Sequence, residues 1–284
     1  MLYLIGLGLN LKGISLEGIE AIRKCKKVYL ESYTVEFPYS TAELEKVLGV
    51  KVCVLGREDV EGDRLVEESR KSDVGLLVYG CPLFATTHMS LIEGCGKVEI
   101  IYAASVFDGI ASSGLQLYKF GKVSSMPKWA KGFEPVSFLD YVKENLSIGA
   151  HSLILVDIGL KFSDAVSQLV DGCSKSGVDL KNVVVCSRVG SEEGKIFYVD
   201  ELKDKGLKGL GGKRVKGLKG LEGKKVKGLK GLEGKKVKAP FCFVIPGKMH
   251  FMEEEVLKAW RVGGGLILRR SRGRLAPVRS AVES

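Results

Sequence analysis

A short strand-like run followed by a polar turn is where chemistry is easiest to place in this sequence. Residues 76–79, LLVY, form an apolar and aromatic run that is typical of a strand buried on both faces of a parallel sheet. Gly80 and Pro82 end that strand, and ligands of open α/β sheets bind just past the carboxyl ends of the strands. Thr86 or Thr87 is expected to cap the next helix. An ordinary strand, turn and helix would explain the same residues without any ligand.

A second turn that could approach a ligand lies at the start of the chain. The opening segment 1–9, MLYLIGLGL, predicts a buried strand rather than a signal peptide, because it lacks a basic start and a cleavage site. Gly6 and Gly8 allow its end to turn tightly or to approach a ligand with no Cβ in the way. The pattern is not the dinucleotide-binding G-x-G-x-x-G, because Leu11 stands where the third glycine is required.

The cysteines and histidines do not indicate a metal site or a disulfide framework. The seven cysteines form no C-x-x-C pair, and their number is odd. His88, His151 and His250 lie in separate segments without metal-ligand spacing, so zinc is not expected. No apolar run reaches the roughly 18 residues that a membrane span needs. We therefore expect reduced thiols and a cytoplasmic protein.

Alternating strand and helix patterns predict an α/β fold in two parts. In the first part, strand patterns at 1–9, 28–30, 50–55, 74–79 and 98–102 alternate with helix patterns, among them those at 42–48 and 60–71, which predicts a parallel sheet. A second α/β part follows, with helix patterns at 138–146 and 165–173 and strand patterns at 153–158, 183–186, 196–199 and 241–245. We expect domains at 1–121 and 122–258, a connection or active-site loop at 122–136, and a disordered Gly/Arg-rich tail at 259–284.

The formal net charge of +10 comes from two segments rather than from the predicted domains. Residues 206–238 repeat an eleven-residue unit as GLKGLGGKRVK, GLKGLEGKKVK and GLKGLEGKKVK, with a net charge of +10; the last 26 residues add +5, so the rest carries −5. Many glycines and like charges disfavour a helix, so we expect an exposed loop or loose β-ribbon that folding and ligand binding do not need. A solvated expansion and a weak, non-specific polyanion-binding arm both stay open.

Five ordered segments across residues 1–258 resemble one methyltransferase family. They are MLYLIGLGLN at 1–10, GCPLFATTH at 80–88, Ser105-Val106 with GLQLYKFG at 114–121, HSLILVDI at 151–158, and VIPGKMH at 244–250. In this order they resemble blocks of the diphthine synthases, which are tetrapyrrole-methylase-like methyltransferases. The second segment is similar to that family's GDPxxATTH, with Cys81 in place of the family's acidic residue.

The resemblance implies both a fold and an activity. It implies two α/β domains with a ligand cleft between them, S-adenosylmethionine as cofactor, and methylation of the amino group of a modified histidine on translation elongation factor 2, in diphthamide biosynthesis. It also implies a homodimer. The implied cofactor-binding residues are Leu9, Cys81, Phe84, Ser105, Val106, Val156, Val189 and Phe241. No catalytic residue is implied.

The chemistry of methyl transfer fits such a set of residues. The sulfonium is already activated, so the protein must hold the methyl group in line with the acceptor and exclude water, which glycines, apolar walls and hydroxyls can do. Cys81 is a weaker hydrogen-bond acceptor than a carboxylate, and Phe241 stands where a histidine is common in the family. Two alternatives stay open: a weakly active or silent homologue that binds partners through its basic arm, and a small-molecule tetrapyrrole methylase.

Overall fold

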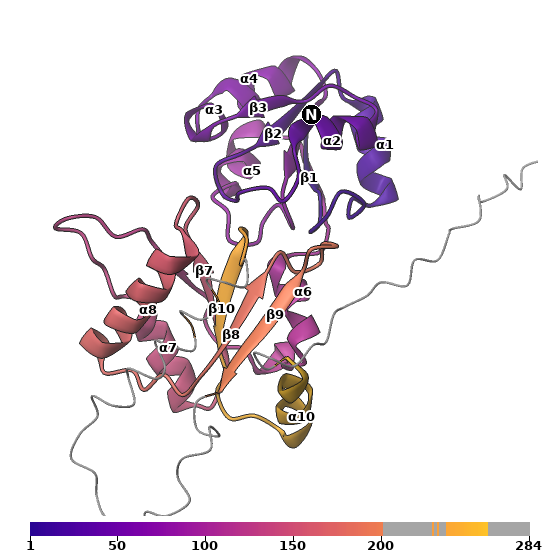
Figure 1. Cartoon of the computed structure of the whole chain (residues 1–284). Helices are drawn as coiled ribbons and strands as arrows, with labels where there is room; N and C mark the ends of the chain where they lie inside the picture. The colour runs from indigo at the N-terminus through magenta and orange to yellow at the C-terminus, as the bar shows by residue number, and fades with distance from the viewer. Residues whose placement is uncertain (201–228, 230–231, 233–236, 261–284) are drawn as a thin grey trace, which may run out of the picture.

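The computed structural model describes residues 1–200, 229, 232 and 237–260, and shows two five-stranded sheets (Figure 1). The first sheet is parallel, in the order β3-β2-β4-β1-β5. Its strands are β1 Leu2–Gly6, β2 Lys27–Glu31, β3 Cys53–Leu55, β4 Val74–Val78 and β5 Val98–Ile101. Its helices are α1 Leu16–Lys24, α2 Thr41–Leu48, α3 Arg57–Glu61, α4 Arg64–Lys71 and α5 Met89–Cys95.

Strict alternation along β1 explains why both faces of the first sheet are covered. Leu2 and Leu4 pack into one cluster with residues of α3, α4 and α5, whereas Tyr3 and Ile5 pack into the other with residues of α1 and α2. Successive side chains of a strand point to opposite faces, so an all-apolar strand needs a helical layer on each side. The predicted parallel α/β arrangement of this half is confirmed.

The second sheet is mixed, in the order β6-β7-β10-β8-β9. Its strands are β6 Ser124–Met126, β7 Ser152–Val156, β8 Asn182–Ser187, β9 Lys195–Asp200 and β10 Phe241–Ile245. Helices α7 Phe138–Ser147 and α8 Phe162–Ser176 cover one face, and α6 Val106–Ile110 and α10 Phe251–Ala259 lie on the other (Figure 1). Two short 3₁₀ helices, η1 Ala111–Ser113 and η2 Leu117–Lys119, follow α6.

Three local predictions differ from the structure. The helix expected at 60–71 is two helices, because α3 ends before Gly62 and α4 begins at Arg64. The expected connection at 122–136 contains β6, an edge strand of Ser-Ser-Met that carries almost no apolar signal and pairs in parallel with β7 alone. Helix α10 was not predicted from the sequence.

The third copy of the repeat contributes to the core. Leu229 and Leu232 are 1% and 0% exposed, they belong to the cluster of α7, α8 and β10, and Val237 packs against it. Leu232 also donates its backbone N–H to the carbonyl of Leu229 at 3.0 Å. The prediction of an exposed loop is therefore wrong at these two leucines, whose apolar side chains outweigh the glycines and charges around them. The other repeat copies and the tail predicted at 259–284 lie outside the described residues, except for the end of α10 and Trp260.

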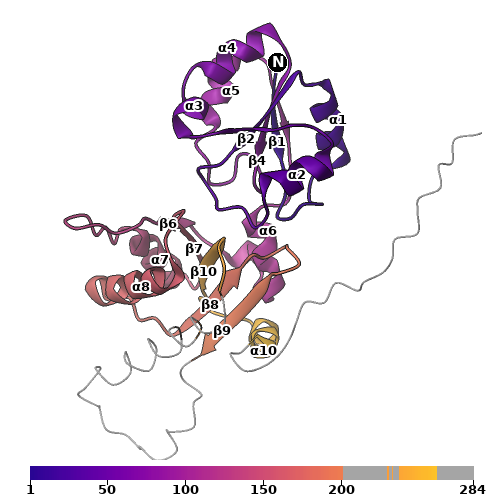
Figure 2. The same cartoon turned by 45° about the horizontal axis from the view of Figure 1, so that its top comes forward.

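The carboxyl ends of the parallel strands face the second sheet (Figure 2). The chain crosses between the halves after β5, and α6 carries it over. Ile110 at the end of α6, and Leu115 after it, pack in one cluster with Leu153 and Val184 of the second sheet. The division at residue 121 stays a prediction, since the second core includes residues that precede it. No helix in the described part of the chain is long and apolar enough to span a membrane.

Candidate active site

The turns after β1 and β4 lie side by side at the carboxyl edge of the parallel sheet. Gly8 and Gly80 exchange backbone hydrogen bonds of 3.2 and 3.0 Å, and their φ angles are +66° and +75°. A Cβ on Gly6 would lie 2.7 Å from the carbonyl oxygen of Gly80. Gly6 is needed because the two backbones approach too closely for a side chain, whereas Gly8 and Gly80 are needed because other residues rarely adopt their φ angles.

A pocket opens between these turns and the second sheet. About 780 Å³ of space between the atoms lies there, with the open solvent at its mouth included. All eight residues implied by the resemblance line it: Leu9, Cys81, Phe84, Ser105, Val106, Val156, Val189 and Phe241. The structure thus brings together residues that lie as far as 232 positions apart in the sequence.

The two halves of the molecule contribute different walls to the pocket. The first half supplies the turns after β1, β4 and β5, through Leu9, Phe84 and Ser105. The second half supplies the end of β7 through Val156 and the start of β10 through Phe241. A ligand would therefore touch both sheets.

Sequence reasoning missed one wall. Thr34 and Val35 also line the pocket, and they follow β2, whose carboxyl end reaches the same edge of the sheet. The rule applied to Gly80 applies equally to the segment after Glu31. The run VYLES predicts β2 clearly enough that this segment could have been included.

Close packing holds Leu9 at the base of the pocket. A Cβ added to Gly190 would lie 2.6 Å from the Leu9 Cβ, and one added to Gly109 would lie 2.8 Å from the Leu9 Cδ1. In the described part of the chain, two residues other than glycine have positive φ, namely Ala85 at 58° and Arg188 at 48°. Ala85 lines the pocket and Arg188 precedes Val189, so both strained residues occur at this site.

Ser105 is fixed as the N-cap of α6. Its hydroxyl accepts the Phe107 N–H at 3.1 Å and donates to the Asp108 carboxylate at 2.8 Å, and its backbone N–H donates to the same carboxylate at 2.6 Å. The capping box satisfies donors at the helix start and sets the direction of α6.

The pocket lining is electrically neutral. Among the described residues that line it there is no aspartate, glutamate, lysine, arginine or histidine. The Tyr79 hydroxyl donates to the Leu9 carbonyl at 3.1 Å, and burial raises the Tyr79 pKa. A hydrogen bond with Cys242, followed by burial, raises the pKa of the Cys186 thiol. A ligand with a localised negative charge would meet no cation in this lining, whereas a cationic or neutral one meets no like charge.

The ATTH segment shapes the turn and does not cap the helix with a threonine. The Thr86 hydroxyl donates to the Pro82 carbonyl at 2.7 Å, and the buried His88 contacts the same oxygen through Nδ1 at 3.0 Å. Thr87 donates to Glu61 at 2.8 Å. The N-cap of α5 is His88, without a side-chain cap bond. The predicted threonine cap is wrong, because the turn after Pro82 takes up the Thr86 hydroxyl.

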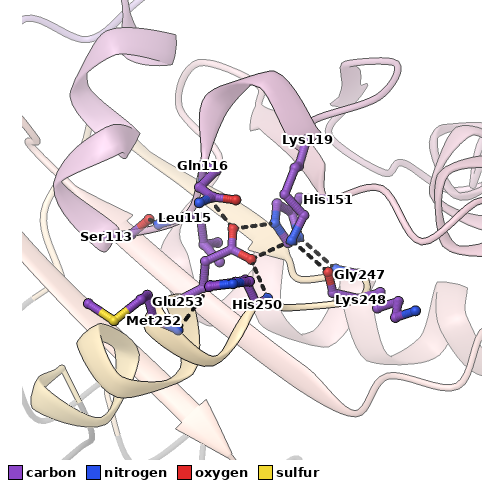
Figure 3. A network of polar contacts seen from close by, with 10 residues as sticks. All are labelled: Ser113, Leu115, Gln116, Lys119, His151, Gly247, Lys248, His250, Met252 and Glu253. Atoms are coloured by element: carbon purple, nitrogen blue, oxygen red, sulfur yellow. Dashed lines mark hydrogen bonds and ion pairs between the residues drawn. The ribbon is translucent and has the colours of Figure 1, made fainter.

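A second polar site lies away from the pocket, around the buried Glu253 (Figure 3). One carboxylate oxygen accepts the Gln116 N–H and His151 Nε2, both at 2.9 Å. The other oxygen accepts the His250 N–H at 2.6 Å and the Lys119 ammonium. Three of the five segments in the resemblance therefore meet at this carboxylate, outside the pocket.

Hydrogen bonding fixes the protonation of this network. Burial alone would raise the Glu253 pKa, but hydrogen bonds from the backbone at Gln116 and His250, and then from Lys119 and His151, lower it to about 2. Burial lowers the His151 pKa despite that carboxylate. His151 Nδ1 accepts the Gly247 N–H at 2.9 Å, so a neutral ring carries its proton on Nε2. The network joins η2, β7 and α10.

Comparison with known proteins agrees with this geometry. The sequence pattern of the family described as "Tetrapyrrole (Corrin/Porphyrin) Methylases" matches residues 1–205. The chain belongs to this family. The family uses S-adenosylmethionine as methyl donor. Its members include proteins that act on small tetrapyrroles as well as the relatives described next, so family membership alone leaves the substrate open.

The relatives are diphthine synthases. "Diphthine synthase" of Methanocaldococcus jannaschii is 36% identical over 279 residues, which cover 91% of this chain and 98% of that protein. "Diphthine methyl ester synthase" of Homo sapiens is 41% identical over 179 residues, covering 61% of this chain and 62% of the human protein. A structure described as "putative diphthine synthase from Entamoeba histolytica" superposes with a TM-score of 0.74 at 29% identity, covering 92% of this chain and 98% of that one.

Coverage differs between these relatives. The alignments with the first curated relatives, from Schizosaccharomyces pombe and human, span 59% and 62% of their lengths, whereas the archaeal alignment spans nearly the whole protein. The family model ends at residue 205, next to the start of the repeat. The chain thus spans a little under two thirds of the length of these two eukaryotic relatives.

Proposed function

We propose that this chain is an S-adenosylmethionine-dependent methyltransferase of the diphthine synthase type, which methylates the amino group of the modified histidine of translation elongation factor 2. The observation that carries the proposal is the pocket: the eight residues implied by the resemblance, six of them from four of its five segments, line one neutral hollow between the two sheets. Relatives named for diphthine support the proposal, at 41% identity over 179 residues and 36% identity over 279 residues.

The pocket lining suits two parts of the cofactor. Its described residues include no cationic side chain to repel the positive sulfonium, and its apolar side chains can pack against the adenine ring. Leu9, Phe84, Val106 and Val156 would supply apolar contacts, and Ser105 lies at the wall nearest α6. The cofactor supplies an activated methyl group, so the side chains need only bind, orient and exclude water.

A pair of variants at Ser105 tests cofactor binding. Ser105→Arg should fill the pocket and abolish saturable binding of S-adenosylmethionine in calorimetry. Ser105→Ala is the matched control: it also loses the cap, at a cost of about 1 kcal/mol, but leaves the pocket open and should bind. Binding that survives Ser105→Arg, with both variants folded by circular dichroism, would refute the proposed site.

Methyl transfer to elongation factor 2 tests the activity itself. Wild-type protein incubated with cofactor and with factor carrying the unmethylated modified histidine should add methyl groups of about 14 Da each, as seen by mass spectrometry. Mild alkali removes a methyl ester but not an N-methyl group, so it distinguishes the amine product from the ester named for the human relative. Cofactor binding without any transfer would favour the silent homologue, and transfer to a tetrapyrrole alone would favour the small-molecule methylase.

We further propose that the chain forms a homodimer through the apolar surface beside the Glu253 network. Tyr118, Ile148 and Phe251 are 82%, 79% and 65% exposed. Their segments contact one another, because Lys248 receives a hydrogen bond from Lys119 at 2.8 Å and donates to Gly149 at 2.9 Å. Exposed apolar patches of this kind mark interaction sites. Light scattering should give twice the monomer mass, and Phe251→Glu should reduce it to the monomer mass.

A further inference from the structure

A buried carboxylate stands behind the wall of the pocket that the sequence did not predict. Glu31, the last residue of β2, is 1% exposed. One of its oxygens accepts the backbone N–H groups of Tyr33 and Thr34 at 2.5 and 2.7 Å, and the other accepts the Thr34 hydroxyl at 2.5 Å. Among the ion pairs of the described residues, none includes Glu31. The hydrogen bonds that Glu31 accepts all come from Tyr33 and Thr34, in the segment that follows β2.

This arrangement determines which way the Thr34 hydroxyl can act. A hydroxyl has one proton and two lone pairs, and the proton of Thr34 is committed to Glu31. The oxygen can then only accept hydrogen bonds from a further partner. Because Thr34 lines the pocket, the wall it forms is a hydrogen-bond acceptor backed by a buried carboxylate.

We propose that Thr34, held by Glu31, receives an N–H group of the acceptor amine and so selects an amine over a carboxylate as the methyl acceptor. The inference rests on the proposed methyltransferase function and names the chemistry of its acceptor. An amine can donate N–H to Thr34 while its lone pair points toward the methyl group. A carboxylate has only lone pairs, and it would face both the Thr34 oxygen and the Glu31 charge behind it. Glu31 is a positioning residue because it acts through Thr34.

The bonds formed and broken are those of a simple displacement. The amine lone pair forms the new N–C bond, the bond from the methyl carbon to sulfur breaks, and its electron pair stays on sulfur. The resulting ammonium loses a proton to water before it can accept another methyl group. No oxidant, reductant or metal takes part in this sequence.

Successive methylation should depend on Thr34 unequally. A neutral primary amine has two N–H groups and a secondary amine has one, whereas a neutral tertiary amine has none. Thr34 can therefore orient the acceptor for the first and second transfers but not for a third. A residue that merely shaped the loop would affect all transfers alike.

Variants at Thr34 separate these roles. In Thr34→Val, single-turnover rates of the first and second transfers to elongation factor 2 should fall about tenfold, the factor that one lost hydrogen bond produces, with no comparable fall in any third transfer. Thr34→Ser keeps the hydroxyl and should restore the rates. Thr87→Val, the same change at an exposed threonine outside the pocket, is the matched control and should behave as wild type.

Glu31→Gln tests the positioning role. The glutamine oxygen can still accept the backbone N–H groups, but its amide would donate to Thr34 and turn the hydroxyl proton away. The wall would change from acceptor to donor, so amine methylation should slow about tenfold and the share of alkali-labile ester should rise. Calorimetry should give an unchanged affinity for S-adenosylmethionine, which shows that the variant is folded.

The outcomes distinguish this inference from the proposed function. Equal slowing of all transfers in Thr34→Val, failure of Thr34→Ser to restore the rates, or wild-type rates in Thr34→Val would each overturn the role of Thr34 and leave the enzyme assignment intact. A wild-type protein that binds no S-adenosylmethionine would instead refute the proposed function, and the acceptor site with it.

Discussion

Two buried carboxylates, one in each half of the molecule, show how the same group serves different purposes. Glu31 and Glu253 are 1% and 0% exposed, and each accepts two backbone N–H groups. Glu253 also binds Lys119 and His151, and its contacts join three elements of the second half. Glu31 adds only a hydroxyl, and that hydroxyl belongs to a residue of the pocket.

The difference lies in how far the charge is compensated. When a buried carboxylate is paired with a lysine, its negative charge is already balanced. Its role is then to hold the neighbouring elements together. A carboxylate with only neutral donors keeps a negative field at the pocket edge, where a ligand can respond to it. Substitutions on the Glu253 side should therefore change stability, and substitutions on the pocket side should change binding and turnover.

The largest expected effect is loss of the Glu253 carboxylate. Glu253→Ala leaves Lys119 and two backbone N–H groups without their partner in the interior, and breaking a buried pair in this way costs about 3–5 kcal/mol. Urea unfolding should show that loss. Glu144→Ala, which breaks the exposed pair with Lys122, is the control and should change stability by less than about 1 kcal/mol. Equal losses in both variants would remove the distinction between the two carboxylates.

The third repeat copy is the next test of the stability side. Leu232→Ala removes a side chain that is 0% exposed in the core and should cost about 2–5 kcal/mol in the same measurement. Leu16, which is 85% exposed, provides the control, because Leu16→Ala makes the same change on the surface and should alter stability by less than about 0.5 kcal/mol. Similar losses at both positions would contradict a special role for the third copy.

The comparison between the halves also explains what the sequence could predict. In the first half, long apolar strands such as β1 and β4 and the caps at Ser15 and Ser105 are local signals, and the elements match them closely. In the second half, β6 is three residues with two serines, and its existence depends on pairing with β7. No local pattern carries such information.

Leu229 and Leu232 show the same limit more sharply. Their eleven-residue sequence is rich in glycine and lysine and has no local pattern of a core segment, so tertiary context decides that these two leucines are buried. The pocket residues were implied by the family resemblance. Four of them, Leu9, Cys81, Phe84 and Ser105, also follow the carboxyl ends of parallel strands, which meet at one edge. Thr34 was missed because its segment is not among the five that resemble the family.

Acidification should lower the stability of the protein mainly by protonating Glu253. Its pKa is about 2 in the folded protein and near 4.5 when unfolded, so its contribution is present above pH 4.5 and is lost as the pH falls through about 2. A shift of this size corresponds to roughly 3 kcal/mol. His151, whose pKa is lowered by burial, adds a smaller loss as the pH falls below 6.5.

Free energies of unfolding measured between pH 7 and pH 2 check whether stability falls as the pH is lowered. Wild type should lose stability steadily below pH 6.5 and most steeply below pH 4.5. In Glu253→Gln the steep part should be absent, because the titrating carboxyl is gone. A variant curve parallel to that of wild type would place the acid-sensitive group elsewhere.

The smallest predicted effect concerns Cys81, where a charge can be placed in the neutral pocket. Cys81 is half-buried, lines the pocket, and fixes the turn by accepting the Phe84 N–H on its carbonyl at 3.2 Å. A carboxylate there would accept charge-assisted hydrogen bonds from the cofactor, at about 1.5–3 kcal/mol. Cys81→Asp should therefore tighten S-adenosylmethionine binding about ten- to a hundredfold, whereas Cys81→Ser, with no charge, should change it little.

Thermal melts of Cys81→Asp with and without cofactor decide between two environments at this position. If the side chain faces the cofactor, the apo melting temperature stays near that of wild type, because a half-buried carboxylate keeps some water, and the gain on adding cofactor is larger than in wild type. If it faces apolar neighbours instead, an unpaired carboxylate is costly to bury, so the apo form melts lower and affinity does not improve. The second result would make the neutral pocket a fixed property of this chain.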